Sequence, residues 1–164
     1  MQVKVIRGYR RSARAVVLVT LLAGSVFAQA PDPMIGVWKA NVAKSTYDPG
    51  PPSKSTTTKY EMIGDKIKVT TDSVQADGTT RHYESTCAYD GKDCPITGNS
   101  PYGDTVARTR VDARTIRSVN KKAGKVTATQ ISVIAPDGKT RTLTTTGVNA
   151  AGQKVHNVTV YEKQ

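Results

Sequence analysis

The sequence predicts an all-β fold, a single antiparallel up-and-down meander barrel of about eight to ten strands behind a signal peptide. Three observations support this prediction. Runs rich in Thr, Val, Ile and Tyr recur along the chain, short turn sequences separate them, and no window shows sustained apolar i, i+3, i+4, i+7 spacing. Threonine suits a pleated strand because of its branched Cβ. A long meander usually closes, since closure removes its exposed edges.

The chain begins with a segment typical of an export signal. Residues 1–14 carry five basic residues and no acid, and residues 15–27 are almost entirely apolar. Ala28 ends a stretch of the kind that a signal peptidase reads, so we expect cleavage between Ala28 and Gln29. The apolar run is shorter than the roughly 20 residues of a membrane-spanning helix. We therefore expect a periplasmic or secreted protein with no transmembrane segment after cleavage; the alternative is an uncleaved anchor.

The remainder has the size of one domain. Removing residues 1–28 from the 164-residue chain leaves 136 residues, which we divide into a linker, 29–34, and a barrel domain, 35–164. The signal holds five of the 24 basic residues and none of the 13 acidic ones, so its removal lowers the net charge from +11 to +6. The remaining Lys and Arg residues are scattered and form no block interleaved with aromatics. We expect no nucleic-acid partner, and the oligomeric state stays open.

The first expected strand, 35–43, contains the only tryptophan. Gly36 and Trp38 lie on one face of a period-2 strand, and the missing side chain at Gly36 leaves room for the indole to lie against neighbouring backbone. The proline-rich segment 45–53 then excludes a helix or a central strand. We expect this segment to cross one end of the barrel as a loop.

Nine further strand-like runs follow, separated by turns. Asp-Gly turns are strong hairpin signals, because glycine adopts positive φ at little cost. A type I turn with a glycine bulge at 77–78 places Thr71 opposite Tyr83, and the same turn at 137–138 places Val133 opposite Arg141. The inward face is partly polar, so the interior is either wet, as in a ligand-holding barrel, or packed by small side chains. The expected strands are 54–62, 66–75, 79–88, 92–97, 105–111, 114–120, 125–135, 139–148 and 154–162.

Gly36-Val37-Trp38 at the head of the first strand resembles the signature of the lipocalin-like (calycin) β-barrels, here an outlying domain of the kind found in exported bacterial proteins. The closing strand Val155–Tyr161 and the all-strand meander extend this resemblance over nearly the whole chain after the signal. The resemblance implies a barrel that binds a small hydrophobic or amphipathic molecule. In this family an arginine near the last strand packs over the tryptophan; here Lys154 or Lys163 would take that place.

Cys87 and Cys94 flank the Asp90-Gly91 turn, and a cysteine pair in an exported protein usually oxidises. With a two-residue turn the two cysteines lie directly opposite each other. With a glycine bulge they become diagonal neighbours that need some adjustment to bond. We expect a disulfide, and we expect no metal site, because only His82 and His156 could complete one.

A ligand site is expected around Arg108 and Arg117. Across a two-residue turn at Asp112-Ala113 the two arginines lie directly opposite, where like charges repel. One interpretation is a wet outer face on which solvent screens the repulsion. The other places them at the barrel mouth or interior, where a ligand carboxylate or phosphate relieves it. Fatty-acid-binding relatives use Arg and Tyr in this way, which adds Tyr83 and, opposite it, Thr71.

No catalytic set is visible in the sequence. It contains no Gly-x-Ser-x-Gly, no His-Glu-x-x-His and no glycine-rich phosphate loop, so we expect a non-enzyme without a cofactor. The sequence therefore predicts an exported barrel that binds a small hydrophobic or amphipathic molecule, anionic if the arginines contact it. The competing interpretation is a structural or envelope-associated protein that acts through its surface and holds nothing inside.

Overall fold

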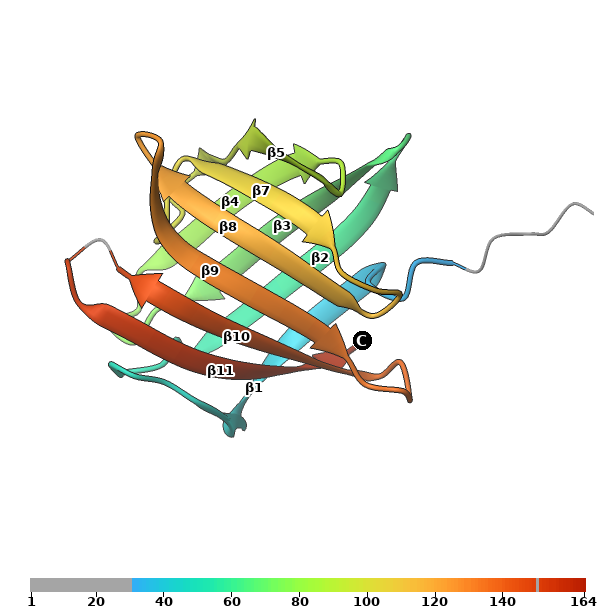
Figure 1. Cartoon of the computed structure of the whole chain (residues 1–164). Coiled ribbons are helices and arrows are strands. Elements are labelled where there is room, and N and C mark those ends of the chain that lie inside the picture. The colour runs from blue at the N-terminus through green and yellow to red at the C-terminus, as the bar shows by residue number, and fades with distance from the viewer. Residues whose placement is uncertain (1–30, 150) are drawn as a thin grey trace, which may run out of the picture. The chain divides into compact units, whose positions relative to one another are not determined.

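The computed structural model describes residues 31–149 and 151–164, so the expected signal peptide and its cleavage site lie outside the described residues. Residues from Pro31 onward form one compact unit whose regular elements are all β-strands (Figure 1). No described segment forms a helix of the length and apolarity that a membrane crossing requires. The strands are β1 (Gly36–Thr46), β2 (Ser55–Ile63), β3 (Lys66–Val74), β4 (Thr80–Cys87), β5 (Asp90–Pro95), β6 (Thr97–Gly98), β7 (Thr105–Arg110), β8 (Thr115–Lys122), β9 (Lys125–Ile134), β10 (Thr140–Val148) and β11 (Lys154–Lys163).

These strands form one antiparallel sheet that curls into a nearly closed barrel (Figure 1). The order is β5-β7-β8-β9-β10-β11-β1-β2-β3-β4-β6, so the meander closes where the last strand pairs with the first. In that pair Trp38 faces Lys163 and Ala40 faces Tyr161. The predicted all-β, lipocalin-like meander is confirmed. One detail differs: the expected strand 92–97 is two short strands, β5 and β6, which pair with different neighbours.

The turn at Asp77-Gly78 sets the register between β3 and β4. Gln75 donates its backbone N–H to Thr79, and the Asp77 carboxylate accepts the Thr79 N–H at 2.9 Å, which closes a three-residue loop. Thr71 therefore pairs with Tyr83. This register confirms the prediction from the turn sequence.

The predicted register of the β9–β10 hairpin is wrong by one residue. Arg141 pairs with Ile134 and not with Val133. The loop holds one residue more than assumed: Ala135 donates its N–H to the carbonyl of Thr140, and the Asp137 carboxylate accepts the N–H groups of both Lys139 and Thr140, at 2.8 and 3.2 Å. The shift reverses the face of β9, so that Ile134 is 1% exposed inside the barrel while Val133 is 41% exposed outside.

Trp38 closes one end of the barrel. Its side chain is fully buried, and its indole Nε1 donates a hydrogen bond to the backbone oxygen of Met34 at 2.8 Å. Met34, Ile116, Ile134 and Tyr161 pack with it as the apolar cluster of this end. The indole thus seals the barrel where β1 begins.

Lys163 takes the position over the tryptophan that the family resemblance assigns to an arginine. Its Nζ lies 5.2 Å from the centre of the Trp38 ring. A Cβ at Gly36 would lie 2.8 Å from Lys163 Cε, and the φ of Gly36 is +128°. The missing side chain at Gly36 therefore makes room for Lys163, and not for the indole as the sequence analysis proposed.

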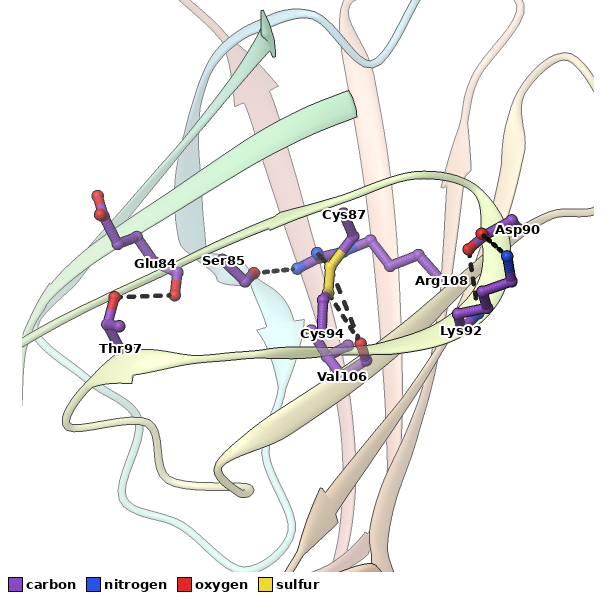
Figure 2. Close-up of a disulfide and its surroundings, with 9 residues drawn as sticks. All are labelled: Glu84, Ser85, Cys87, Asp90, Lys92, Cys94, Thr97, Val106 and Arg108. Carbon is purple, nitrogen blue, oxygen red and sulfur yellow. Dashed lines mark hydrogen bonds and ion pairs between the residues drawn. A yellow bond between two sulfur atoms is a disulfide. The ribbon is translucent and has the colours of Figure 1, made fainter. Parts of the chain in front are cut away.

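A seam remains where the two edges of the sheet meet, with β5 at one edge and β6, paired to β4, at the other. The predicted disulfide between Cys87 of β4 and Cys94 of β5 is present and crosses this seam, with the two Cα atoms 5.9 Å apart (Figure 2). The sequence predicted a hairpin between the two cysteines, with either a two-residue turn or a glycine bulge. Neither hairpin is formed, because the strand of Cys94 pairs with β7, where Cys94 lies opposite Val106. The disulfide therefore joins two edges of the barrel.

We expect Trp38→Phe to lower the free energy of unfolding by about 1–3 kcal/mol, because the buried Met34 carbonyl loses its donor. Urea denaturation followed by circular dichroism measures this change. Val126→Ala, at an exposed position, is the control and should stay within about 0.5 kcal/mol of wild type. An equal effect of both substitutions would contradict the sealing role of the indole.

Replacing both Cys87 and Cys94 with serine should lower the free energy of unfolding by about 2 kcal/mol, the range for a short closed loop. Equilibrium urea unfolding of wild type with and without dithiothreitol provides the comparison. Reduced wild type should match the double variant. If all three forms unfold at the same urea concentration, the disulfide does not stabilise the barrel.

Candidate functional site

The barrel interior holds two neighbouring cavities. The outer cavity, about 210 Å³, lies at the end where β1 passes into β2, opposite the Trp38 end, and the proline loop lines it through Pro49 and Pro51. The inner cavity, about 60 Å³, lies deeper. Five side chains line both cavities and form what we call the waist: Thr71, Tyr83, Gln130, Leu143 and Tyr161.

The structure brings together three of the four predicted ligand-site residues. Thr71 and Tyr83 face each other at the waist, and Arg108 lines the inner cavity. Burial raises the pKa of the Tyr83 phenol, so its hydroxyl stays protonated and can donate a hydrogen bond. Thr71 and Tyr83 thus line both cavities, and Arg108 lines the inner one.

Arg117 does not join them. The predicted pairing of Arg108 with Arg117 is wrong by one residue, because Arg108 pairs with Ser118 and Arg117 pairs with Thr109. The turn is longer than the two residues assumed, since Val111 donates its N–H to the carbonyl of Thr115. Arg117 consequently lies exposed on the outer face of the barrel, in agreement with the wet-face interpretation for that residue alone.

Arg108 spans the seam from the inside (Figure 2). Its side chain is 8% exposed, with Nη2 donating to Ser85 Oγ at 2.8 Å and Nη1 to Cys87 Sγ at 3.0 Å. Burial lowers the pKa of Arg108, and nearby phenol groups act in the opposite direction. Its hydrogen-bond partners are neutral, so its positive charge has no counterion among them.

Arg141 is a second buried cation, which the sequence analysis did not assign to the site. It is 1% exposed, and its Nη1 donates to Tyr60 OH at 3.1 Å and to Ser132 Oγ at 3.3 Å. Its guanidinium lies 4.0 Å from the centre of the Tyr161 ring. Nε and Nη2 have no hydrogen-bond partner in the described part of the chain. Strand alternation alone would have placed Arg141 inside, on the face of Leu143.

The two arginines give the inner cavity an uncompensated positive charge. None of the residues that line either cavity is an aspartate or a glutamate. Arg110 shows the contrast, because it pairs with the carboxylate of Asp32 and lies 4.2 Å from the centre of the Tyr89 ring. Burying a cation without a counterion costs free energy. The inner cavity therefore has the electrostatics of an anion site, in which guanidinium N–H groups point at an oxyanion.

Comparison with known proteins identifies the fold. No family model and no curated protein matches the sequence. The crystal structure of the ileal bile acid-binding protein of zebrafish, complexed with cholic acid, is similar with a TM-score of 0.50 at 13% identity, covering 80% of this chain and 99% of that one. The siderocalin Ex-FABP covers 80% of this chain and 74% of its own at 15% identity, but its TM-score of 0.38 is too low to support an argument. The chain has the predicted lipocalin-like calycin fold.

We expect Arg141→Met to leave the free energy of unfolding of the ligand-free protein unchanged or to raise it by up to about 4 kcal/mol, because it removes a buried, uncompensated charge. Arg110→Met is the matched control. It deprives the Asp32 carboxylate of its partner and should destabilise the protein by about 1–3 kcal/mol. Urea denaturation measures both. A clear loss of stability in Arg141→Met would show that this guanidinium is structural.

Proposed function

We propose that the chain is an exported lipocalin-like protein that binds a small anionic molecule non-covalently inside its barrel. The observation that carries the proposal is the pair of buried guanidinium groups, Arg108 and Arg141, which form no ion pair with a carboxylate among residues 31–149 and 151–164. A ligand oxyanion in the inner cavity would supply the missing negative charge and accept hydrogen bonds from the free N–H groups of Arg141. Thr71 and Tyr83 at the waist would contact the rest of the ligand.

One feature of the sequence and one of the structure support a periplasmic or secreted location. The basic and then apolar segment before Ala28 is typical of a cleaved signal. The disulfide between Cys87 and Cys94 fits an oxidising compartment, since thiols stay reduced in the cytosol. We propose that the binding protein works outside the cytoplasm, where it captures its ligand from solution.

A second candidate is a structural barrel that holds nothing inside. The small size of the cavities favours it, because pockets for drug-sized molecules usually measure about 300–1,000 Å³. It does not account for the two uncompensated guanidinium groups, which a structural barrel would do better to replace with apolar side chains. We therefore prefer the binding protein.

Native mass spectrometry of protein purified from its source tests the proposal. Wild type and Arg117→Gln should retain a small acid that mild unfolding releases, because Arg117 lies on the outer face. In Arg108→Gln the affinity for this acid should fall by more than about tenfold, which is the effect of one lost hydrogen bond to a charged group, so the bound acid should be lost on purification. Circular dichroism confirms that each variant is folded.

Two results would overturn the proposal. One is a wild-type protein that is empty on purification and gains no thermal stability from any small acid added in excess. The other is equal retention in Arg108→Gln, Arg141→Gln and the control Arg117→Gln, which would place the ligand away from the inner cavity.

A further inference from the structure

We infer that the ligand is a compact acid rich in hydroxyl groups, of the class of sugar acids and sugar phosphates, and not a fatty acid. This inference rests on the proposed anion binding inside the barrel and narrows the chemistry of what is bound. Three features of the interior support it: the polarity of the cavity walls, the location of the apolar side chains and the size of the space.

Hydroxyl and amide side chains line the middle of the barrel. Thr58 and Thr71 lie within 3.5 Å of each other, and Gln130 Nε2 donates to Thr145 Oγ1 at 3.3 Å. Asn120 Nδ2 donates in turn to Gln130 Oε1 at 3.1 Å. All five residues line one or both cavities, and the three threonine hydroxyls keep further donor or acceptor capacity. A wall of this kind offers hydrogen bonds in several directions at once.

An acyl chain would be a poor occupant of that wall. It would displace water from the donor and acceptor positions that these hydroxyl and amide groups do not use among themselves, and it would not replace those hydrogen bonds. Each such group left unpaired would weaken binding by about tenfold or more. A hydroxylated ligand returns those bonds. Because the penalty falls only on the apolar ligand, the wall selects strongly for the polar one.

Most of the largest buried apolar side chains lie away from the cavities. The buried cluster of Met34, Trp38, Ile116 and Ile134 packs against itself at the closed end. Among these four, only Ile116 lines a cavity. The other apolar residues that line the two cavities are Val69, Ile96, Leu143, Val155 and four prolines, beside five tyrosine rings that carry a hydroxyl as well as a face. Hydroxyl, amide and guanidinium side chains outnumber them, so an acyl chain would meet more polar than apolar groups.

The outer end continues the same chemistry. The outer cavity is lined there by Tyr47, Tyr102, Asn149 and Asn157, together with the guanidinium-bearing Arg81. Its volume of about 210 Å³ suits a ligand of monosaccharide size, and the inner cavity of about 60 Å³ suits one acidic group. The acidic group would lie between Arg108 and Arg141, with the hydroxylated body at the waist.

Isothermal titration calorimetry with purified, refolded protein tests this class of ligand. The probes are gluconate, glucuronate, galacturonate and glucose 6-phosphate, with octanoate as the apolar acid and glucose as the neutral sugar. At least one hydroxylated acid should bind more than about tenfold tighter than both octanoate and glucose. The affinity of the tightest-binding carboxylate is then compared with that of glucose 6-phosphate, and the tighter of the two identifies the acidic group.

The failures of the two proposals can be told apart. If octanoate binds tighter than every hydroxylated acid, the inference is wrong while anion binding in the barrel stands. If glucose binds as tightly as the sugar acids, the acidic group adds nothing to binding, and the proposed anion site at the two arginines is wrong. If no probe binds, the inference and the proposed function are both overturned.

A pair of variants on one strand adds a structural test. Thr71→Val removes a waist hydroxyl with little change of shape and should weaken the best hydroxylated acid by about tenfold without weakening octanoate. Thr70→Val makes the same change on the opposite face of β3 and should alter neither affinity. Should Thr71→Val fail to fold, Thr145→Val and its control Thr144→Val on β10 replace this pair. Equal affinities in variant and control would overturn the hydroxyl-rich assignment.

Discussion

The position of the Arg141 guanidinium links the closed end of the barrel to its cavities. On one side it lies against Tyr161 and, at 5.6 Å from the ring centre, against Trp38. On the other side Arg141 lines the inner cavity, and two of its nitrogens, Nε and Nη2, have no hydrogen-bond partner among the described residues. The aromatic rings hold it away from solvent, so its charge cannot be hydrated as a surface arginine is. Much of the chemistry of the interior follows from this one buried cation and from Arg108 near it.

The interior otherwise differs from an ordinary hydrophobic core. Large apolar groups are concentrated at one end, and the middle of the barrel is lined by threonine, serine and amide side chains. The stability of such a protein depends on the continuous ladder from β7 through β11 and β1 to β4, and on the seal around Trp38. This division leaves the central space free for polar recognition. It also explains why a chain with few large apolar residues still closes into a barrel.

Most of the fold could be predicted from the sequence, because the signals are local. Alternation and turn residues located nearly every strand, and Gly36 with Trp38 indicated the family of folds. The register errors lie at two hairpins whose loops hold one residue more than assumed, and the change of partner between β5 and β6 was not predicted either. Whether an aspartate side chain retains an extra residue in a turn depends on atomic geometry, which residue types alone do not determine. Each error reverses a strand face, and the one at the turn after β7 put Arg117 on the same face as Arg108. Arg141 was not considered for the site, although alternation places it on the inward face of Leu143.

The seam has a consequence for where this chain can fold. The segment from β5 to β6 changes partner midway, from β7 to β4, so backbone pairing does not close the wall there continuously. Without the disulfide between Cys87 and Cys94, no covalent bond holds the two edges together, and another copy of the chain could pair with their free N–H and C=O groups in an intermolecular sheet. Folding with both thiols reduced, as in a reducing compartment, would therefore favour aggregation.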